Sequence, residues 1–232
     1  DQQANILGWS VDGKEIFYSE TERTAPRVFA ISVSSGKPRT LTTGSGIFGG
    51  ASFSADTKTM AVVHQTPEQL PQVVVSPTLK FTPVKITTVN RDFPGLAHGR
   101  TEVIKWKSKD GKEIEGLVTY PVNYVSNRKY PLVLNIHGGP AGVFTESYTG
   151  ASSIYPLQAL AAANYVILRP NPRGSSGYGV EFRRANINDW GFGDYDDDMG
   201  GVDLLIEIGV VHPDSLGVCG CSYGGFMTSF II

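Results

Sequence analysis

The sequence predicts an α/β fold that follows an all-β segment with an internal repeat. Two similar stretches begin 44 residues apart, at Trp9 and at Phe53. Beyond residue 100, short apolar runs alternate with amphipathic segments, which is the pattern of a sheet built from strand–helix units. The composition is that of a folded globular protein, because 41% of the 232 residues are hydrophobic and 18% are charged.

The repeat joins an aromatic residue to a polar turn and then to several short strands. The first unit contains Trp9-Ser10-Val11-Asp12 and the second Phe53-Ser54-Ala55-Asp56, and the strand patterns that follow recur at the same spacing. A period of about 40–50 residues with several strands in each unit is typical of β-propeller blades. Because a propeller needs at least four blades, residues 1–95 are predicted to be the C-terminal blades of a larger propeller.

A segment rich in glycine and proline separates this region from the rest of the chain. Asn90–Arg100 contains Pro94, Gly95 and Gly99 and is predicted as a linker. A G-x-G-x-x-G pattern at Gly44–Gly49 lies among the repeats and is followed by no helical pattern. A dinucleotide site needs strand, turn and helix in that order, so no cofactor is predicted.

Residues 96–232 are predicted to form a mostly parallel α/β sheet. The expected elements, in order, are a β-hairpin (101–107 and 113–120), a buried strand (131–136), a helix (154–163), a second buried strand (165–168), a helix (196–208) and a strand (216–219). The last helix is supported by an apolar stripe of Met199, Val202, Leu205 and Ile206, and by the acids that crowd its first turn.

The sequence Gly220-Cys221-Ser222-Tyr223-Gly224 has the form G-x-S-x-G and follows the last predicted strand. This pattern predicts a nucleophile elbow, in which a strained turn exposes the serine hydroxyl above the sheet. Ser222 is therefore the predicted nucleophile of an α/β-hydrolase domain. Such a domain takes its oxyanion donors from two backbone N–H groups. One is that of Tyr223, and the other belongs to the loop His137-Gly138-Gly139-Pro140.

The general base of this hydrolase is not evident in the chain. His137 precedes the nucleophile, whereas the hydrolase order is serine, acid and then histidine, so His137 is predicted to orient the oxyanion loop. The other three histidines (64, 98 and 212) are predicted to be surface or capping residues, the last in a loop. No His, Asp or Glu follows Ser222, and the chain ends on uncapped Phe230-Ile231-Ile232. We therefore expect a domain truncated after the elbow, whose acid and base lie beyond residue 232.

Several other classes of partner are not predicted. The acids 194 and 196–198 do not form an EF-type calcium loop, because Met199 and Leu205 occupy the places of the required Gly and Glu, so no metal is expected. A net charge of −2 and the lack of a 20-residue apolar run argue against nucleic acid and against a membrane span. Cys219 and Cys221 are predicted to stay unpaired, and they leave the compartment open.

Four motifs occur in an order that resembles the prolyl oligopeptidase family of serine peptidases, in particular its acylaminoacyl-peptidase and dipeptidyl-peptidase branch. They are His137–Pro140, Asn171–Gly179, Asp189-Trp190-Gly191 with Asp194-Tyr195, and Gly220–Thr228. The resemblance implies an acyl-enzyme on Ser222, oxyanion donors at Tyr223 N–H and Gly139 N–H, and short peptides as substrates. It also implies a propeller before the hydrolase domain and a triad Asp and His that follow the nucleophile by many tens of residues. Some relatives carry at the position of His137 a tyrosine whose hydroxyl serves the oxyanion, which His137 does not do in the same way.

Two alternatives to a peptidase stay open at this point. The same elbow and oxyanion loop cleave esters in carboxylesterases. A non-catalytic binding protein that kept the hydrolase fold and lost its triad also fits the residues present. The sequence leaves homo-oligomerisation open as well.

Overall fold

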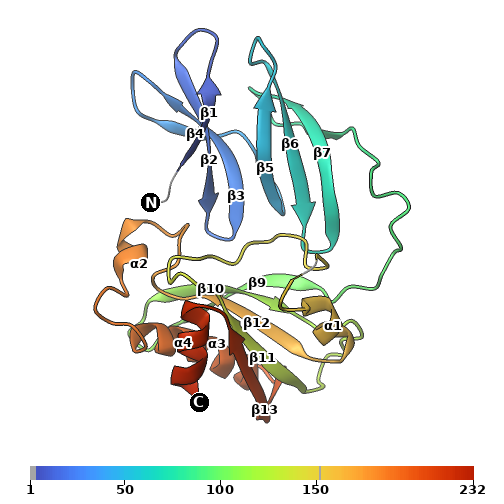
Figure 1. Cartoon of the computed structure of the whole chain (residues 1–232), viewed down its shortest axis with the longest axis vertical. Coiled ribbons are helices and arrows are strands. Elements are labelled where there is room, and N and C mark those ends of the chain that lie inside the picture. The colour runs from blue at the N-terminus through green and yellow to red at the C-terminus, as the bar shows by residue number, and fades with distance from the viewer. Residues whose placement is uncertain (1–3, 152) are drawn as a thin grey trace. The chain divides into compact units, whose positions relative to one another are not determined.

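The computed structural model describes residues 4–151 and 153–232. Residues 1–3, at the start of the first predicted domain, and Ser152 lie outside the described residues. The chain divides into two compact units (Figure 1). The first comprises Asp1–Gly95 and Thr145–Tyr148, and the second comprises Leu96–Phe144 and Thr149–Ile232.

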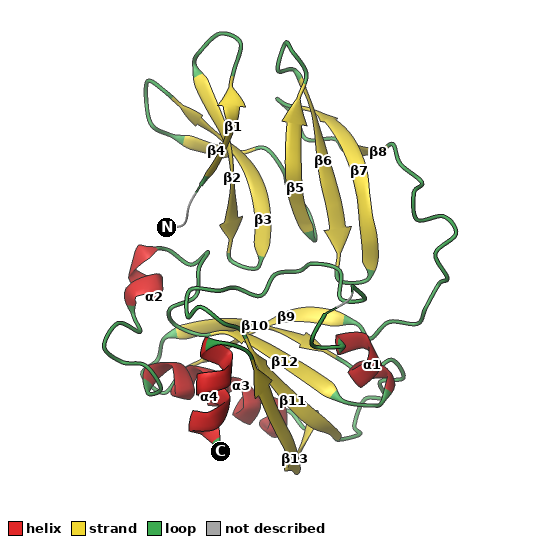
Figure 2. Ribbon diagram, viewed as in Figure 1, coloured by secondary structure: helices red, strands yellow, loops and turns green. Residues whose placement is uncertain are grey.

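The first unit consists of two four-stranded antiparallel sheets (Figure 2). One contains β1 (Asn5–Trp9), β2 (Glu15–Glu22), β3 (Ala25–Ser32) and β4 (Pro38–Thr40) in that spatial order, and the other β5 (Ile47–Phe53), β6 (Thr59–Thr66), β7 (Gln69–Pro77) and β8 (Val84–Lys85). Their facing side chains form one core, in which the rings of Phe17 and Phe53 stack with centroids 4.2 Å apart.

The sequence repeat corresponds to a repeated hydrogen-bonded turn. Ser10 Oγ donates to Asp12 Oδ1 at 2.7 Å, and Ser54 Oγ donates to Asp56 Oδ1 at the same distance. In each turn the aspartate oxygen also accepts a backbone N–H two residues later at 3.1 Å. The S-x-D turn therefore closes the connection between the first two strands of both sheets in the same way.

The second unit contains a five-stranded sheet in the order β13-β11-β12-β10-β9. The strands are β9 (Thr101–Lys107), β10 (Glu113–Thr119), β11 (Tyr130–Ile136), β12 (Val166–Asn171) and β13 (Val211–Gly220). Strand β11 runs parallel to β12 and to β13, while β10 pairs antiparallel with β12 and with β9. The prediction of a mostly parallel sheet is thus wrong for this chain, because the N-terminal hairpin contributes both antiparallel pairings.

Four helices accompany this sheet: α1 (Leu157–Ala162), α2 (Val180–Arg184), α3 (Gly193–Glu207) and α4 (Tyr223–Ile231). Helix α3 begins three residues before its predicted start, because Asp194 Oδ1 accepts the N–H groups of Gly191 and Tyr195 and so fixes the first turn. Strand β13 begins at Val211, so that His212 lies in a strand and not in the predicted loop. None of the helices in the described ranges has both the length and the apolar character needed to cross a bilayer.

The two faces of the sheet differ in what covers them. Val166 and Leu168 on β12 belong to a large apolar core that also takes in Val202 and Leu205 of α3 and Met227 of α4. Ile167, which points to the other face, packs with Leu157 and Ala161 of α1 in a much smaller cluster. Alternate residues of one strand therefore face two different layers, as the pleat of a strand requires.

Candidate active site

Ser222 lies at the sharp turn between β13 and α4. Its backbone has φ +57° and ψ −122°, a sparsely populated conformation for a residue with a Cβ. Its side chain is exposed, and its carbonyl oxygen accepts the N–H groups of Gly225 and Phe226 at 2.9 and 3.1 Å. The turn thus presents the hydroxyl while the helix begins directly behind it, which is the strand–turn–helix form that G-x-S-x-G predicts.

Two glycines of the motif allow strand and helix to approach each other closely. A Cβ on Gly220 would collide with the backbone of Gly224, and a Cβ on Gly224 would collide with the carbonyl oxygen of Ile136 at the end of β11. These positions therefore admit no side chain, and the first turn of α4 is held against the carboxyl end of β11.

The loop that follows β11 passes beside the serine. A Cβ placed on Gly138 would lie 3.2 Å from Ser222 Cβ and 3.7 Å from its Oγ. Gly139 has φ +131°. Within residues 4–151 and 153–232, neither the Gly139 N–H nor the Tyr223 N–H donates a hydrogen bond. Both groups are thus available to a developing oxyanion.

His137 contacts two other loop residues through its ring nitrogens. Its Nδ1 lies 2.9 Å from the carbonyl oxygen of Gly138, and its Nε2 lies 3.0 Å from Ser175 Oγ. Burial lowers the pKa of His137, which the contact with Gly138 partly opposes. The neutral imidazole therefore donates from Nδ1 to the carbonyl and accepts the Ser175 hydroxyl at Nε2. This geometry fits a residue that orients the loop.

A second loop supports the first. Ser176 Oγ donates to the Ala141 carbonyl at 2.6 Å, and the Ser176 N–H donates to the Gly142 carbonyl at 3.1 Å. Sequence reasoning did not assign these roles to Ser175 and Ser176. The available signal was their position in the Gly174–Gly179 motif, but only the fold shows that this motif meets the loop after β11.

Tyr223 is fixed through its side chain. Its hydroxyl donates to Asp194 Oδ2, and its ring meets that of Trp190 edge to face with centroids 5.4 Å apart. Burial and the neighbouring carboxylate raise the pKa of the Tyr223 phenol. Burial also raises the pKa of Asp194, and hydrogen bonds, of which that from Tyr223 is the strongest, oppose this rise. Asp194 and Trp190 come from the third quoted motif, and neither was predicted to act on the residue after the serine.

The acids of α3 contact protein groups. Asp197 accepts the Arg173 N–H, Nε and Nη2 at 2.7, 2.9 and 2.8 Å, and its backbone carbonyl accepts Trp106 Nε1 at 2.7 Å. Among the described residues, no group of three or more His, Cys, Asp and Glu side chains is arranged to hold a metal ion. Asp197 therefore anchors the second loop, whose first residues include Arg173.

No described side chain forms a hydrogen bond with Ser222 Oγ, so this part of the chain holds no general base in place. His64 contacts the Ser45 carbonyl, His98 the Leu96 carbonyl and His212 the Asp214 N–H. Cys219, directly before the motif, and Cys221, within it, are free thiols.

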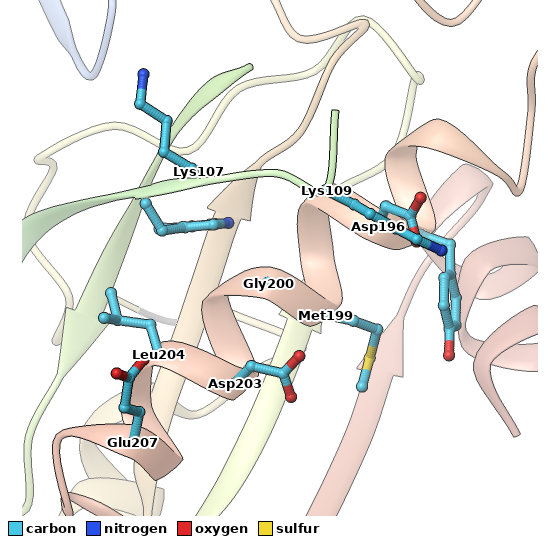
Figure 3. Close-up of a pocket in the computed structure, with 10 residues that line it drawn as sticks. Lys107, Lys109, Asp196, Met199, Gly200, Asp203, Leu204 and Glu207 are labelled. Atoms are coloured by element: carbon cyan, nitrogen blue, oxygen red, sulfur yellow. The ribbon is translucent and has the colours of Figure 1, made fainter. Parts of the chain in front are cut away.

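A pocket of about 720 Å³ opens between α3 and β9 (Figure 3). Its lining combines the cations Lys107 and Lys109 with three acids of α3 (Asp196, Asp203 and Glu207). The Lys109 side chain extends toward Asp196, and their charged atoms are 4.0 Å apart. None of the predicted site residues lines this pocket.

Comparison with known proteins relates the chain to serine peptidases. Residues 151–232 match the family model described as Prolyl oligopeptidase family. Among curated proteins, an uncharacterized peptidase of Bacillus subtilis, YuxL, is 42% identical over 132 residues, which are 56% of this chain and 19% of YuxL. Dipeptidyl-peptidase 5 of Aspergillus fumigatus is 28% identical over 237 residues, which cover all of this chain and 32% of the relative.

Solved structures share the fold over nearly the whole chain. An acylaminoacyl peptidase of Pyrococcus horikoshii superposes with a TM-score of 0.79 at 22% identity, over 98% of this chain and 34% of that protein. Dipeptidyl peptidase 4 of Porphyromonas gingivalis gives a TM-score of 0.79 at 21% identity, over 97% of this chain and 32% of that protein. The chain thus spans about a third or less of the relatives named here.

The family match and the curated relatives together place the resemblance among serine peptidases. The chain is related to serine peptidases of the prolyl oligopeptidase (S9) family, the resemblance that its motifs predicted.

Proposed function

We propose that the protein is a serine-type peptidase that cleaves short peptides through an acyl-enzyme on Ser222. The observation that carries this proposal is the exposed hydroxyl at φ +57° beside Gly138, with two unengaged N–H groups next to it. The names of the relatives support peptides as substrates. Because the chain spans about a third of those relatives, the activity is proposed for the whole protein.

In the proposed reaction, Ser222 Oγ attacks the carbonyl carbon of the scissile bond while a general base takes the hydroxyl proton. The base and the acid that orients it come from outside the described residues. The carbonyl oxygen gains negative charge and accepts the N–H groups of Tyr223 and Gly139. Collapse of the tetrahedral intermediate releases the amine, which takes up the proton from the base, and water then hydrolyses the acyl-enzyme.

The finer architecture is part of the same proposal. Residues 96–232 would be the N-terminal portion of an α/β-hydrolase domain, which the strand–turn–helix at Ser222 and the oxyanion loop support. Residues 1–95 would be the C-terminal blades of a β-propeller, which the two four-stranded sheets with matching turns support. In the full protein, a propeller would restrict entry to short or unfolded peptides.

Labelling with a fluorophosphonate probe tests the nucleophile. We expect one adduct on Ser222 in the natively expressed protein, located by mass spectrometry of its peptides, and none in Ser222→Ala. Ser229→Ala is the matched control, because Ser229 is an exposed serine of the helix that follows Ser222, and its hydroxyl donates to the Gly225 carbonyl. A folded wild-type protein without an adduct would favour the binding-protein alternative.

A substrate panel separates the two enzymatic alternatives. Peptides of two to six residues and matched acyl esters would be compared by kcat/KM in the unlabelled wild-type protein and in Ser222→Ala. Turnover of peptides that Ser222→Ala loses supports the peptidase. Turnover of esters alone would identify a carboxylesterase.

A further inference from the structure

Arg169, in the middle of β12, is a buried cation without a counter-charge. Only 4% of the residue is exposed, and its Nε and Nη2 have no hydrogen-bond partner in the described part of the chain. Burial lowers its pKa to about 10, and no neighbouring acid acts in the opposite direction. Isolated buried charges are costly and are normally paired, so these donors call for an acceptor.

The aromatic ring that covers Arg169 is held firmly in place. The guanidinium carbon lies 5.5 Å from the centre of the Phe144 ring. Asn171, two residues further along the strand, binds both backbone polar groups of Phe144. Its Oδ1 accepts the Phe144 N–H at 2.7 Å, and its Nδ2 donates to the Phe144 carbonyl at 3.0 Å. The ring thus packs on the guanidinium, while Nε and Nη2 keep no hydrogen-bond partner in the described part of the chain.

A second unpartnered amide lies on the neighbouring strand. Leu134 of β11 pairs with Leu168 of β12 in parallel register, so Asn135 and Arg169 follow on the opposite face of the sheet, side by side. Asn135 is 2% exposed and its Oδ1 has no partner among the described residues. Since the two ends of an asparagine amide exchange by rotation, Asn135 can turn its NH₂ toward an anion held by Arg169.

We propose that Arg169 and Asn135 form a binding site for a carboxylate group on this face of the sheet, beneath Phe144. Nε and Nη2 lie along one edge of the guanidinium, and their parallel N–H bonds match the two oxygens of a carboxylate. The carboxylate comes either from a bound peptide, at its C-terminus or an acidic side chain, or from an acidic residue of the protein outside the described chain. This site adjoins the loop beside Ser222, because the Phe144 ring meets that of His137 edge to face with centroids 5.2 Å apart.

Direct binding measurements test the first source and do not depend on turnover, so they stay interpretable if the proposed peptidase activity fails. N-acetyl-Gly-Gly and its C-terminal amide would be titrated calorimetrically into the natively expressed protein. A charge-assisted pair of hydrogen bonds predicts that the free acid binds about 10- to 100-fold more tightly than the amide. Arg169→Met should abolish the difference and Arg169→Lys should retain part of it. Arg128→Met, which removes a cation that lies 5.2 Å from the Tyr130 ring, should leave it unchanged.

A crystal structure of the ligand-free wild-type protein tests the second source. An acidic side chain of the protein about 3 Å from both Nε and Nη2, together with equal binding of acid and amide, would assign the site to an internal ion pair and support the proposal. Only water at both nitrogens, together with equal binding, would overturn it. Both measurements use the wild-type protein, so they decide between these outcomes even if Arg169→Met fails to fold.

Discussion

Arg173 and Arg169 lie four residues apart on the same strand and its following loop, and both are buried, yet their surroundings are opposite. Arg173 engages Asp197 through three N–H groups and lies 3.0 Å from Asp110. These partners raise its pKa. Arg169 has a ring above it and two unpaired N–H groups, and burial lowers its pKa to about 10.

The difference shows that burial alone does not define the role of a charged side chain. Arg173 is neutralised by its own chain, and it joins the loop after β12 to α3. Arg169 is left with donors to which the described chain supplies no acceptor. The first is a structural element and the second a proposed binding site, and the helix α3 offers a similar contrast between Asp197 and Asp198.

Breaking the ion pair between Arg173 and Asp197 should have the largest effect on the free energy of unfolding. Asp197→Asn removes the charge that neutralises Arg173, and we expect a loss of about 3–5 kcal/mol in the free energy of unfolding. Urea denaturation followed by circular dichroism measures it. Asp203→Asn, an exposed acid of the same helix, is the control and should change the value by less than about 0.5 kcal/mol. A loss of similar size in both variants would show that the ion pair of Asp197 with Arg173 contributes no more to stability than an exposed acid.

A smaller effect is expected where only one of several partners is lost. Tyr223→Phe removes the hydroxyl that donates to Asp194 but leaves the two backbone N–H donors of Gly191 and Tyr195 in place. We expect a loss of about 1–3 kcal/mol in the free energy of unfolding, the usual cost of an unsatisfied buried group. Tyr195→Phe, on α3 next to Asp194, serves as control, and an unchanged stability in Tyr223→Phe would show that the hydroxyl is not needed.

The smallest effect, and the only one of opposite sign, is expected at Asp198. Both of its carboxyl oxygens are buried without a partner in the described chain, and burial together with Asp194 and Asp197 raises its pKa well above 3.8. The folded protein therefore holds this proton at pH values where the unfolded chain has lost it. The free energy of unfolding then falls as the pH rises from about 4 through the folded-state pKa.

Asp198→Asn mimics the protonated form and removes this pH dependence. We expect the variant to be more stable than the wild type by about 1–2 kcal/mol at pH 8, with the difference vanishing near pH 4. Thermal unfolding in a series of buffers would measure it. A variant that is less stable at pH 8 would show that the carboxylate has a partner.

Much of the fold could be predicted from local patterns, because alternation and turn residues act over short distances. The S-x-D turns, the hairpin after residue 100 and the strand–turn–helix at Ser222 are of this kind. The start of α3 was missed, since it depends on Asp194 binding back to Gly191. The antiparallel share of the sheet was underestimated because strand order depends on pairings between distant segments.

The candidate active site also has a part that local sequence patterns predict and a part that depends on contacts between distant segments. Ser222 and its flanking glycines form one continuous pattern, so the sequence alone is enough to propose them together. Asp194 and Ser175 act through partners 29 and 38 residues away, respectively, and the proposed carboxylate site likewise joins Arg169 to Phe144, 25 residues away. Such contacts exist only once the sheet has assembled, and no local spacing encodes them.

The backbone of Ser222 has a consequence for the evolution and engineering of this protein. At φ +57° a glycine would fit without strain, whereas a serine costs about 1–3 kcal/mol. Selection for thermal stability alone would therefore drive this position toward glycine and erase the hydroxyl. A screen for more stable variants should consequently retain an activity assay, because at this residue stability favours glycine whereas the proposed activity requires serine.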